Sequence, residues 1–282
     1  MIALTKETFK DLIPVLLALD INTMFALSVL EGKVNGTVYA DDAVSPRAFY
    51  IRHPYGMAFL YDDNGSADFF RQLKPYLLNT NRVRDKFEWL QGVPAALSPK
   101  LDALLGDRLI KVNPDAPYPA LSQQQSGCVL QSQRINYLFC RDKYLTYKQS
   151  RPAHTHSVVK TSREVFYTVN GGVVPKYFWN SYDDFNQFGG GFTLMLDNHI
   201  PASTAFASFV LDNKLEIGIE TAKDYHGMGY GALTCSALID FCLSEGLEPV
   251  WSCNSTNIGS RKLAEKLGFV EYKRIPYYRL PV

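Results

Sequence analysis

The residues best suited to chemistry in this chain form a glycine-rich turn between an expected strand and an expected helix. Gly227, Gly229 and Gly231 alternate directly before an apolar segment that begins at about Tyr230. Glycines permit backbone conformations in which successive N–H groups point the same way, and a helix N-terminus adds a partial positive charge. The turn is therefore suited to a diphosphate. A plain turn into a helix is the structural alternative, although one glycine would suffice for it.

Three classes of phosphate ligand could occupy such a turn. A Walker A loop requires Gly-Lys followed by Ser or Thr, and here Gly32-Lys33 is followed by Val34. A dinucleotide fingerprint matches Gly227, Gly229 and Ala232 only formally, because the turn does not follow its strand directly. The third class, coenzyme A, depends on the residues that flank the turn.

Two carboxylates lie on the expected strand that precedes the turn. Glu216 and Glu220 are four residues apart, so they share a face if the strand is regular and can part if it carries a bulge. A carboxylate placed there could accept a proton from an attacking amine. Solvated strand carboxylates are the alternative interpretation.

The segments around the turn resemble the GNAT acetyltransferase superfamily. His226 to Gly231 is similar to the Arg/Gln-x-x-Gly-x-Gly/Ala turn of that family, with histidine in the first place. Glu216 to Thr221 stands where the family has its splayed fourth strand. Asn257 to Phe269 resembles the family's Asn, helix and Glu-Lys-Leu-Gly-Phe ending. The stretches 216–221, 242–251 and 260–266 further resemble the zwittermicin A resistance type of GNAT acetyltransferase.

The resemblance implies acetyl-CoA as co-substrate and direct acetyl transfer to an amine. The backbone from Ile219 to Thr221 would then hold the acetyl end, and Asn257 and Ser260 would contact the pantetheine arm. The residues that would hold the diphosphate are those of the turn: His226, Gly227, Met228, Gly229, Tyr230, Gly231 and Ala232.

The resemblance also ranks the candidate catalytic groups. Glu216 is the preferred general base because it aligns with a glutamate common at that place in the superfamily, and Glu220 is the second candidate. The tyrosine that usually serves as general acid is replaced by Ala264, so the acid is unassigned. His154 and His156 could chelate a metal, but no third ligand is spaced nearby, and we expect no metal.

Composition and charge limit the partners and the compartment. The 282 residues carry 29 Lys and Arg against 28 Asp and Glu, so no global field favours nucleic acid or an anionic membrane. The apolar stretch 13–30 is interrupted by polar residues, which argues against a signal peptide or a spanning helix. Five cysteines without a C-x-x-C pair argue against a disulfide framework. We expect a cytoplasmic protein with no nucleic-acid or membrane partner, and a homodimer is one candidate assembly.

Residues 113–127 contain three prolines and a polar run, and we place a domain boundary there. The sequence predicts an α/β (α+β) protein: an N-terminal mixed α/β domain at 1–125 and, at 126–282, a GNAT domain with a mixed, mostly antiparallel splayed sheet. Period and turn residues predict strands at 192–196, 205–211 and 215–221 as a meander, a helix at 230–246, and a long strand at 133–147. No internal repeat is visible.

The expected activity is acetylation of a small-molecule amine, such as an antibiotic. Acetylation of a protein or peptide amine is the alternative, and a non-catalytic acetyl-CoA sensor is the alternative from another class. An aromatic group before the glycine triplet at 189–191 is expected to be core, or else to line the acceptor pocket: Tyr177, Phe178, Trp179, Tyr182, Phe185 and Phe188.

Overall fold

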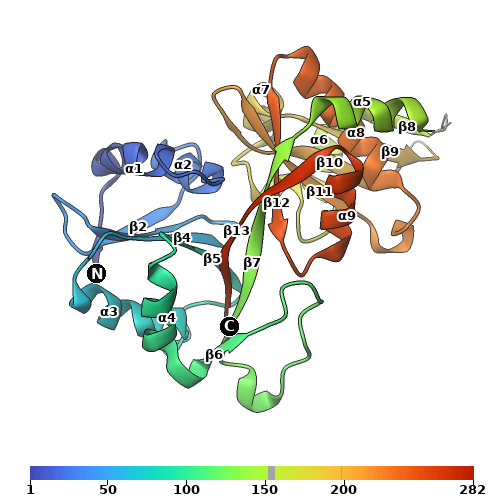
Figure 1. The fold of residues 1–282 in the computed structure, drawn as a ribbon. Coiled ribbons are helices and arrows are strands. Elements are labelled where there is room, and N and C mark those ends of the chain that lie inside the picture. Colours follow the sequence, from blue (N-terminus) through green and yellow to red (C-terminus); the bar gives the residue numbers. More distant parts are fainter. Residues whose placement is uncertain (152–155, 198) are drawn as a thin grey trace. The chain divides into compact units, whose positions relative to one another are not determined.

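The computed structural model describes residues 1–151, 156–197 and 199–282 (Figure 1). The chain divides into two compact units. Unit 1 contains Met1–Asn136, Cys253–Ile258 and Lys273–Val282, and unit 2 contains Tyr137–Ser252 and Gly259–Tyr272. Three strands contribute residues to both units: β7 (Val129–Phe139), β12 (Glu248–Asn254) and β13 (Phe269–Leu280). A boundary at residue 125, inside unit 1, stays a prediction about independent folding.

Unit 1 is built on a five-strand run in the order β1-β2-β3-β4-β5. The steps from β1 to β4 are antiparallel, and β4 pairs with β5 in parallel. Its elements are β1 (Ile2–Ala3), η1 (Lys6–Leu12), α1 (Ile13–Leu17), α2 (Met24–Leu30), β2 (Thr37–Ala40), β3 (Ala48–Arg52), β4 (Met57–Asp62), α3 (Ala67–Leu77), β5 (Glu88–Val93), α4 (Leu97–Leu105), η2 (Gly106–Arg108), β6 (Leu109–Lys111) and η3 (Gln123–Gln125).

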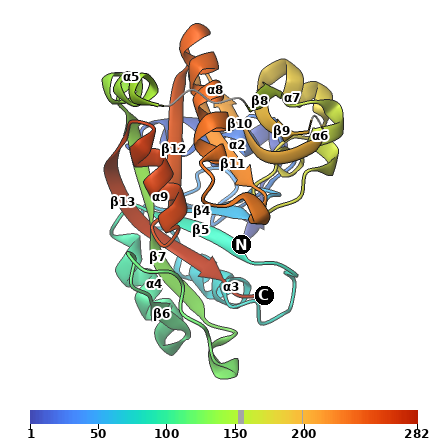
Figure 2. The same ribbon diagram turned by 90° about the vertical axis from the view of Figure 1, so that its right-hand side faces the viewer.

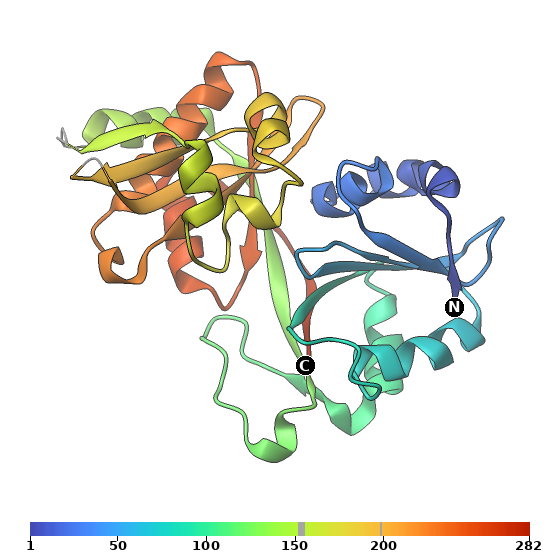
Figure 3. The ribbon, with the colours of Figure 1, turned by 180° about the vertical axis from the view of Figure 1, so that it is seen from behind.

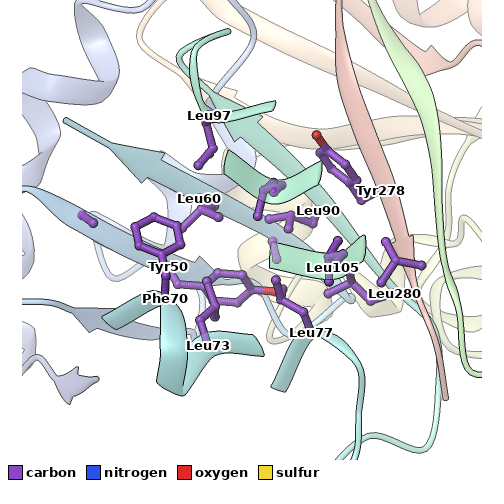
Figure 4. Close-up of a cluster of buried hydrophobic side chains, with 14 of the residues drawn as sticks. Tyr50, Leu60, Phe70, Leu73, Leu77, Leu90, Leu97, Leu105, Tyr278 and Leu280 are labelled. Atoms are coloured by element: carbon purple, nitrogen blue, oxygen red, sulfur yellow. The ribbon is translucent and has the colours of Figure 1, made fainter. Parts of the chain in front are cut away.

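Helices α3 and α4 and the strands of unit 1 share one apolar core (Figure 4). Leu73 and Leu77 of α3, four residues apart on one helix face, are fully buried in it together with Leu90 of β5. Ser66 caps α3, because its side chain accepts a hydrogen bond from the Phe69 N–H. Burial of this apolar face is what fixes α3 and α4 against the sheet.

Unit 2 contains a second five-strand run, in the order β8-β9-β10-β11-β12. Strands β9, β10 and β11 form the antiparallel meander that the sequence predicted, and Asp212 takes the positive φ of its second turn. The further elements are α5 (Arg141–Ser150), β8 (Ser157–Lys160), α6 (Arg163–Thr168), η4 (Pro175–Tyr177), α7 (Tyr182–Phe188), β9 (Gly191–Leu196), β10 (Ile200–Leu211), β11 (Lys214–Thr221), η5 (Lys223–Tyr225), α8 (Tyr230–Ser244) and α9 (Ile258–Lys266).

Both faces of the meander are covered. Helix α8 packs on β9, β10 and β11 (Figure 2). The segment that carries α6 and α7 covers the other face (Figure 3). There the Phe178 ring contacts Phe206 and Phe209, and the Trp179 indole N–H donates to the Ala207 carbonyl at 2.7 Å. Of the aromatic residues before the glycine triplet, Phe178 and Phe185 are therefore core residues of unit 2, and Trp179 and Tyr182 are partly buried. The expectation of a core position is wrong for Tyr177 and Phe188, which are exposed.

The two units have the same topology. In each run of five strands, the first three pairings of neighbouring strands are antiparallel and the fourth is parallel. In each, helical segments follow the first strand, one helix joins the fourth and fifth strands (α3 and α8), and one follows the fifth (α4 and α9). The chain thus contains an internal repeat that the sequence did not reveal.

One predicted element is wrong in its second half. The expected strand at 133–147 ends at Phe139, and α5 follows from Arg141. The change from strand to helix occurs at Cys140. Its N–H donates to the carbonyl of Gly268, and its carbonyl accepts from the Tyr144 N–H. A contact distant in the sequence therefore ends the strand and begins the helix.

Candidate active site

The parallel pairing of β11 with β12 stops part-way along both strands. The paired residues run from Lys214 and Glu248 to Glu216 and Val250. Beyond Glu216, β11 continues to Thr221 without a further partner in β12 among the described residues. The two strands therefore part beyond Glu216 and Val250, and we call the unpaired place beside the end of β11 the opening.

The backbone of β11 presents alternate N–H groups to this opening. The Ala222 N–H donates to the Ala202 carbonyl on the β10 side at 2.9 Å. Because N–H directions alternate along a strand, the groups of Ile219 and Thr221 point away from β10. The Thr221 carbonyl agrees with this direction, because it contacts the His226 ring, at 2.8 Å from Nε2, rather than β10. Two backbone donors thus face the place where β12 has parted from β11.

The glycine-rich turn follows directly and begins α8. Gly227 and Gly229 have positive φ angles of 82° and 80°, and a Cβ added to either would meet no described atom within 4 Å. In the described part of the chain, the N–H groups of Gly229, Tyr230 and Gly231 have no hydrogen-bond acceptor. Open donors at the start of a helix suit an anion such as a diphosphate.

The other residues of the turn hold it in place. A Cβ added at Gly231 would lie 3.3 Å from Thr221 Oγ1 and 3.5 Å from a Leu263 methyl group, so this glycine permits α8 to approach β11 closely. His226 joins the turn to the end of β11 through the contact with Thr221. Met228 is exposed, and Ala232 is buried. The three glycines thus serve two purposes, since two give the turn its conformation and one gives close packing.

The two candidate bases share a face of β11 but differ in surroundings. The bulge of this hairpin lies in β10, between Ala207 and Phe209, so β11 itself is regular. Glu216 is 5% exposed, at the last paired position. Glu220 is partly exposed and lines a cavity of about 190 Å³. Of the two carboxylates, Glu220 is the one with access to a space that could hold a substrate group.

Both predicted pantetheine contacts lie at the start of α9. Ser260 lies on α9 in unit 2, where its Oγ accepts a hydrogen bond from the Trp251 indole at 3.2 Å. Asn257 is exposed and immediately precedes α9. Ala264, at the expected place of the acid, is fully buried in α9.

Buried thiols do not contribute a nucleophile to this region. Cys235 and Cys242 of α8 are buried, and burial raises the pKa of the Cys242 thiol to about 12. Cys253 is 7% exposed. His154 lies outside the described residues, and within these no group of three His, Cys, Asp or Glu side chains could hold a metal ion.

Unit 1 provides an internal comparison at the equivalent place. There β4 and β5 stay paired from Met57 and Trp89 to Tyr61 and Val93. The N–H groups of Gly65 and Ser66 before α3 already donate to Asp62 and Asp41, at 2.8 and 3.0 Å. With the strands joined and carboxylates at the helix start, unit 1 lacks both features that suit unit 2 to an anionic ligand.

Comparison with known proteins agrees with these features. YdfB of Bacillus subtilis (strain 168), named an uncharacterized N-acetyltransferase, is 27% identical over 246 residues, which are 87% of this chain and 85% of that protein. The fold is similar to a GCN5-related N-acetyltransferase-like protein from Streptococcus suis 89/1591, with TM-score 0.69, 21% identity and coverage of 97% and 98% of the two chains. An acetyltransferase of the GNAT family from Colwellia psychrerythraea has TM-score 0.53, with 13% identity and coverage of 99% and 100%.

Among the helices of the described residues, none combines the length with the apolar composition that a membrane span requires.

The family model for GNAT acetyltransferases matches residues 16–278, which is nearly the whole chain and includes both units. The opening beside β11, the glycine turn and this match together show that the chain belongs to the GNAT acetyltransferase family.

Proposed function

We propose that this chain uses acetyl-CoA to acetylate a small-molecule amine by direct transfer, without a covalent enzyme intermediate. The observation that carries the proposal is the end of the β11–β12 pairing at Glu216 and Val250. It leaves the N–H groups of Ile219 and Thr221 facing an opening beside the glycine turn. Acetyl-CoA would supply an activated acetyl group, and these donors would stabilise charge that develops on its carbonyl oxygen.

The residues present fit this co-substrate. The open N–H groups of Gly229, Tyr230 and Gly231 would bind the diphosphate, with His226, Gly227, Met228 and Ala232 completing the turn. Ser260 of α9, and Asn257 by resemblance, would contact the pantetheine arm. One short segment, 219–231, would thus supply N–H donors to the thioester carbonyl at one end and N–H donors to the diphosphate at the other.

Glu220 is proposed as the general base in preference to Glu216. Glu220 lies between Ile219 and Thr221, so its Cα is about 3.8 Å from the Cα of each residue that donates toward the acetyl group. It also lines the cavity, whereas Glu216 is buried where β11 and β12 are still paired. An amine could reach Glu220 directly, while Glu216 would need a bridging water.

The transfer can proceed without a general acid from the protein. The amine nitrogen forms the new C–N bond, the thioester C–S bond breaks, and the sulfur leaves with its electron pair. A thiol has a pKa near about 8.5, so its thiolate is a fair leaving group without a proton from the protein. The absence of a tyrosine at Ala264 is therefore compatible with catalysis.

The choice of a small-molecule acceptor follows the resemblance of 216–221 and 242–251 to the zwittermicin A resistance type. Acetylation of a protein amine and acetyl-CoA sensing without turnover are the competing functions. We place the reaction in the cytoplasm, because the five cysteines include no disulfide-type pattern.

Thiol release from acetyl-CoA with a panel of small amines and of peptide N-termini tests the proposal. We expect turnover with small amines, and a loss of about a hundredfold or more in Glu220→Gln with acetyl-CoA affinity unchanged. Glu245→Gln, an exposed glutamate at the end of α8, is the matched control. Acetyl-CoA binding without turnover for any amine would favour the sensor, and turnover of peptides alone would favour the protein acetyltransferase.

A further inference from the structure

The cavity beside Glu220 has one charged residue among the described residues that line it. Its volume is about 190 Å³. Pro201, Ala202, Ala222 and Val169 give it an apolar lining, and Thr168, Asn170 and Ser203 add uncharged polar groups. A single carboxylate in a mostly apolar recess selects for one positive charge.

A backbone segment from the facing loop holds this carboxylate. The Val173 N–H donates to Glu220 Oε2 at 2.8 Å. Gly171 lies so close that an added Cβ would overlap Cγ, Cδ and Oε2 of Glu220, and its φ of +154° is rarely adopted by residues with a side chain. Gly172 differs, since its added Cβ would lie 3.9 Å from Oε2, an ordinary contact distance. Gly171 and Val173 therefore fix where the carboxylate lies, and a methyl group added at Gly172 would not displace it.

The loop is itself anchored on both sides. Val165 and Val169 before it and Val174 after it are buried in one cluster, against which Met195 of β9 packs. The N–H of Val169 donates to the Val165 carbonyl, which continues α6 up to the cavity wall. The wall of the cavity is thus tied to the core of unit 2 rather than free to follow the side chain of Glu220.

We propose that this cavity binds the ammonium end of the acceptor, and that the acceptor is a compact primary amine with one positive charge and a neighbouring hydroxyl or amide group. The inference rests on the proposed acetyltransferase function and specifies its substrate class. Glu220 would pair with the ammonium, while the exposed side chains of Thr168 and Asn170 offer hydrogen bonds to the neighbouring group. The Ser203 hydroxyl is already hydrogen-bonded to Thr221 and Thr234. At about 190 Å³ the cavity is smaller than the 300 Å³ or more that drug-sized ligands occupy, so only the amine-bearing end would enter.

The same contact prepares the amine for reaction. Glu220 takes one proton from the bound ammonium, and the freed nitrogen lone pair attacks the acetyl carbonyl. The C–N bond forms as the C–S bond breaks, and the sulfur keeps the electron pair. The nitrogen then loses its second proton to the departing thiolate, which gives the neutral amide and the free thiol, and the proton on Glu220 passes to water. Gly171 and Val173 act as positioning residues, since they touch Glu220 and not the reacting atoms.

Saturation-transfer NMR with ethanolamine as the probe tests the site without requiring turnover. Ethylene glycol is the uncharged control of similar size, and choline is the control with a bulky quaternary group. We expect signal for ethanolamine alone, and an affinity about tenfold or more lower in Glu220→Gln and in Gly171→Ala. Gly172→Ala is the matched variant in the same loop and should bind like the wild type.

Two further measurements separate the outcomes. Thermal unfolding shows whether each variant is folded, and Glu220→Gln, which keeps the side-chain shape, carries the test if Gly171→Ala does not fold. Calorimetric binding of acetyl-CoA to the same samples tests the proposed function independently. Equal binding of ethylene glycol, undiminished ethanolamine binding in Glu220→Gln, or no ethanolamine binding by a wild type that binds acetyl-CoA would each overturn the inference while leaving the proposed function in place.

Discussion

The contribution of the glycine turn can be isolated with one residue, Gly229. Its φ of +80° is in the left-handed region, where asparagine is tolerated better than other residues with a side chain. An added Cβ meets no described atom within 4 Å, so Gly229→Asn should fold with a stability change of no more than about 1 kcal/mol. The new side chain would nevertheless project from the residue directly before Tyr230, in the turn whose open N–H groups a diphosphate would contact.

The expected loss of acetyl-CoA affinity follows from those donors. A hydrogen bond to a charged group contributes about 1.5–3 kcal/mol, so loss of one or more raises the dissociation constant by about tenfold to more than a hundredfold. Titration calorimetry measures this directly. Gly246→Asn is the matched control, because Gly246 has a φ of +70° and equally open space at the other end of α8. If Gly229→Asn and Gly246→Asn bind acetyl-CoA alike, the turn does not hold the diphosphate.

Three further predictions concern the whole chain. Calorimetry should give one acetyl-CoA per chain, and a stoichiometry of two would mean that unit 1 also binds it. Burial lowers the pKa of His53 from 6.5 to about 3. Because the folded pKa lies below the unfolded one, the unfolded state takes up a proton first as the pH falls. The contribution of His53 to the free energy of unfolding is therefore fully present above pH 6.5 and is lost as the pH drops toward 3. Between pH 6.5 and 4.5 the free energy of unfolding should fall by about 2 kcal/mol more in the wild type than in His53→Asn, as measured by urea unfolding, and equal losses would refute this. A fragment of residues 126–282 should aggregate, because Tyr278 and Leu280 are buried in the unit 1 core, whereas a soluble fragment with cooperative unfolding would support the boundary at 125.

Local signals were sufficient to predict the meander and α8. The strands around the Asp212 turn and the apolar helix after Gly229 are specified by residues adjacent in the sequence. Strand β5 was not predicted, because Glu88 and Gln91 break its apolar pattern. The structure buries Glu88 at 2% exposure, where its carboxylate pairs with Arg52 at 3.1 Å and accepts hydrogen bonds from Tyr50 and Tyr76. Those partners come from other elements, so the sequence around Glu88 could not show that its charge is compensated.

The candidate site was predictable only as far as it is local. The glycine turn and both glutamates of β11 could be selected from the sequence, and their shared face follows from a regular strand. Glu220 differs from Glu216 in the cavity that it lines and in its contact with Val173, which lies 47 residues away in the sequence. A glycine at 171 gave no signal in advance, since its role depends on the side chain that it approaches.

The two units share one topology, yet the sequence contains one candidate site rather than two. Strand order and pairing sense depend on where apolar faces and turns occur, and many residues satisfy them, so two units can share a fold without a visible sequence repeat. Ligand binding depends on particular backbone groups. In unit 2 the pairing of β11 with β12 ends early and the helix begins at Gly229 with open donors, whereas in unit 1 the pairing of β4 with β5 continues to Tyr61 and carboxylates already accept the N–H groups before α3. A diphosphate placed there would face those carboxylates and would have to displace their hydrogen bonds, so acetyl-CoA binding by unit 2 alone is the outcome that the backbone favours.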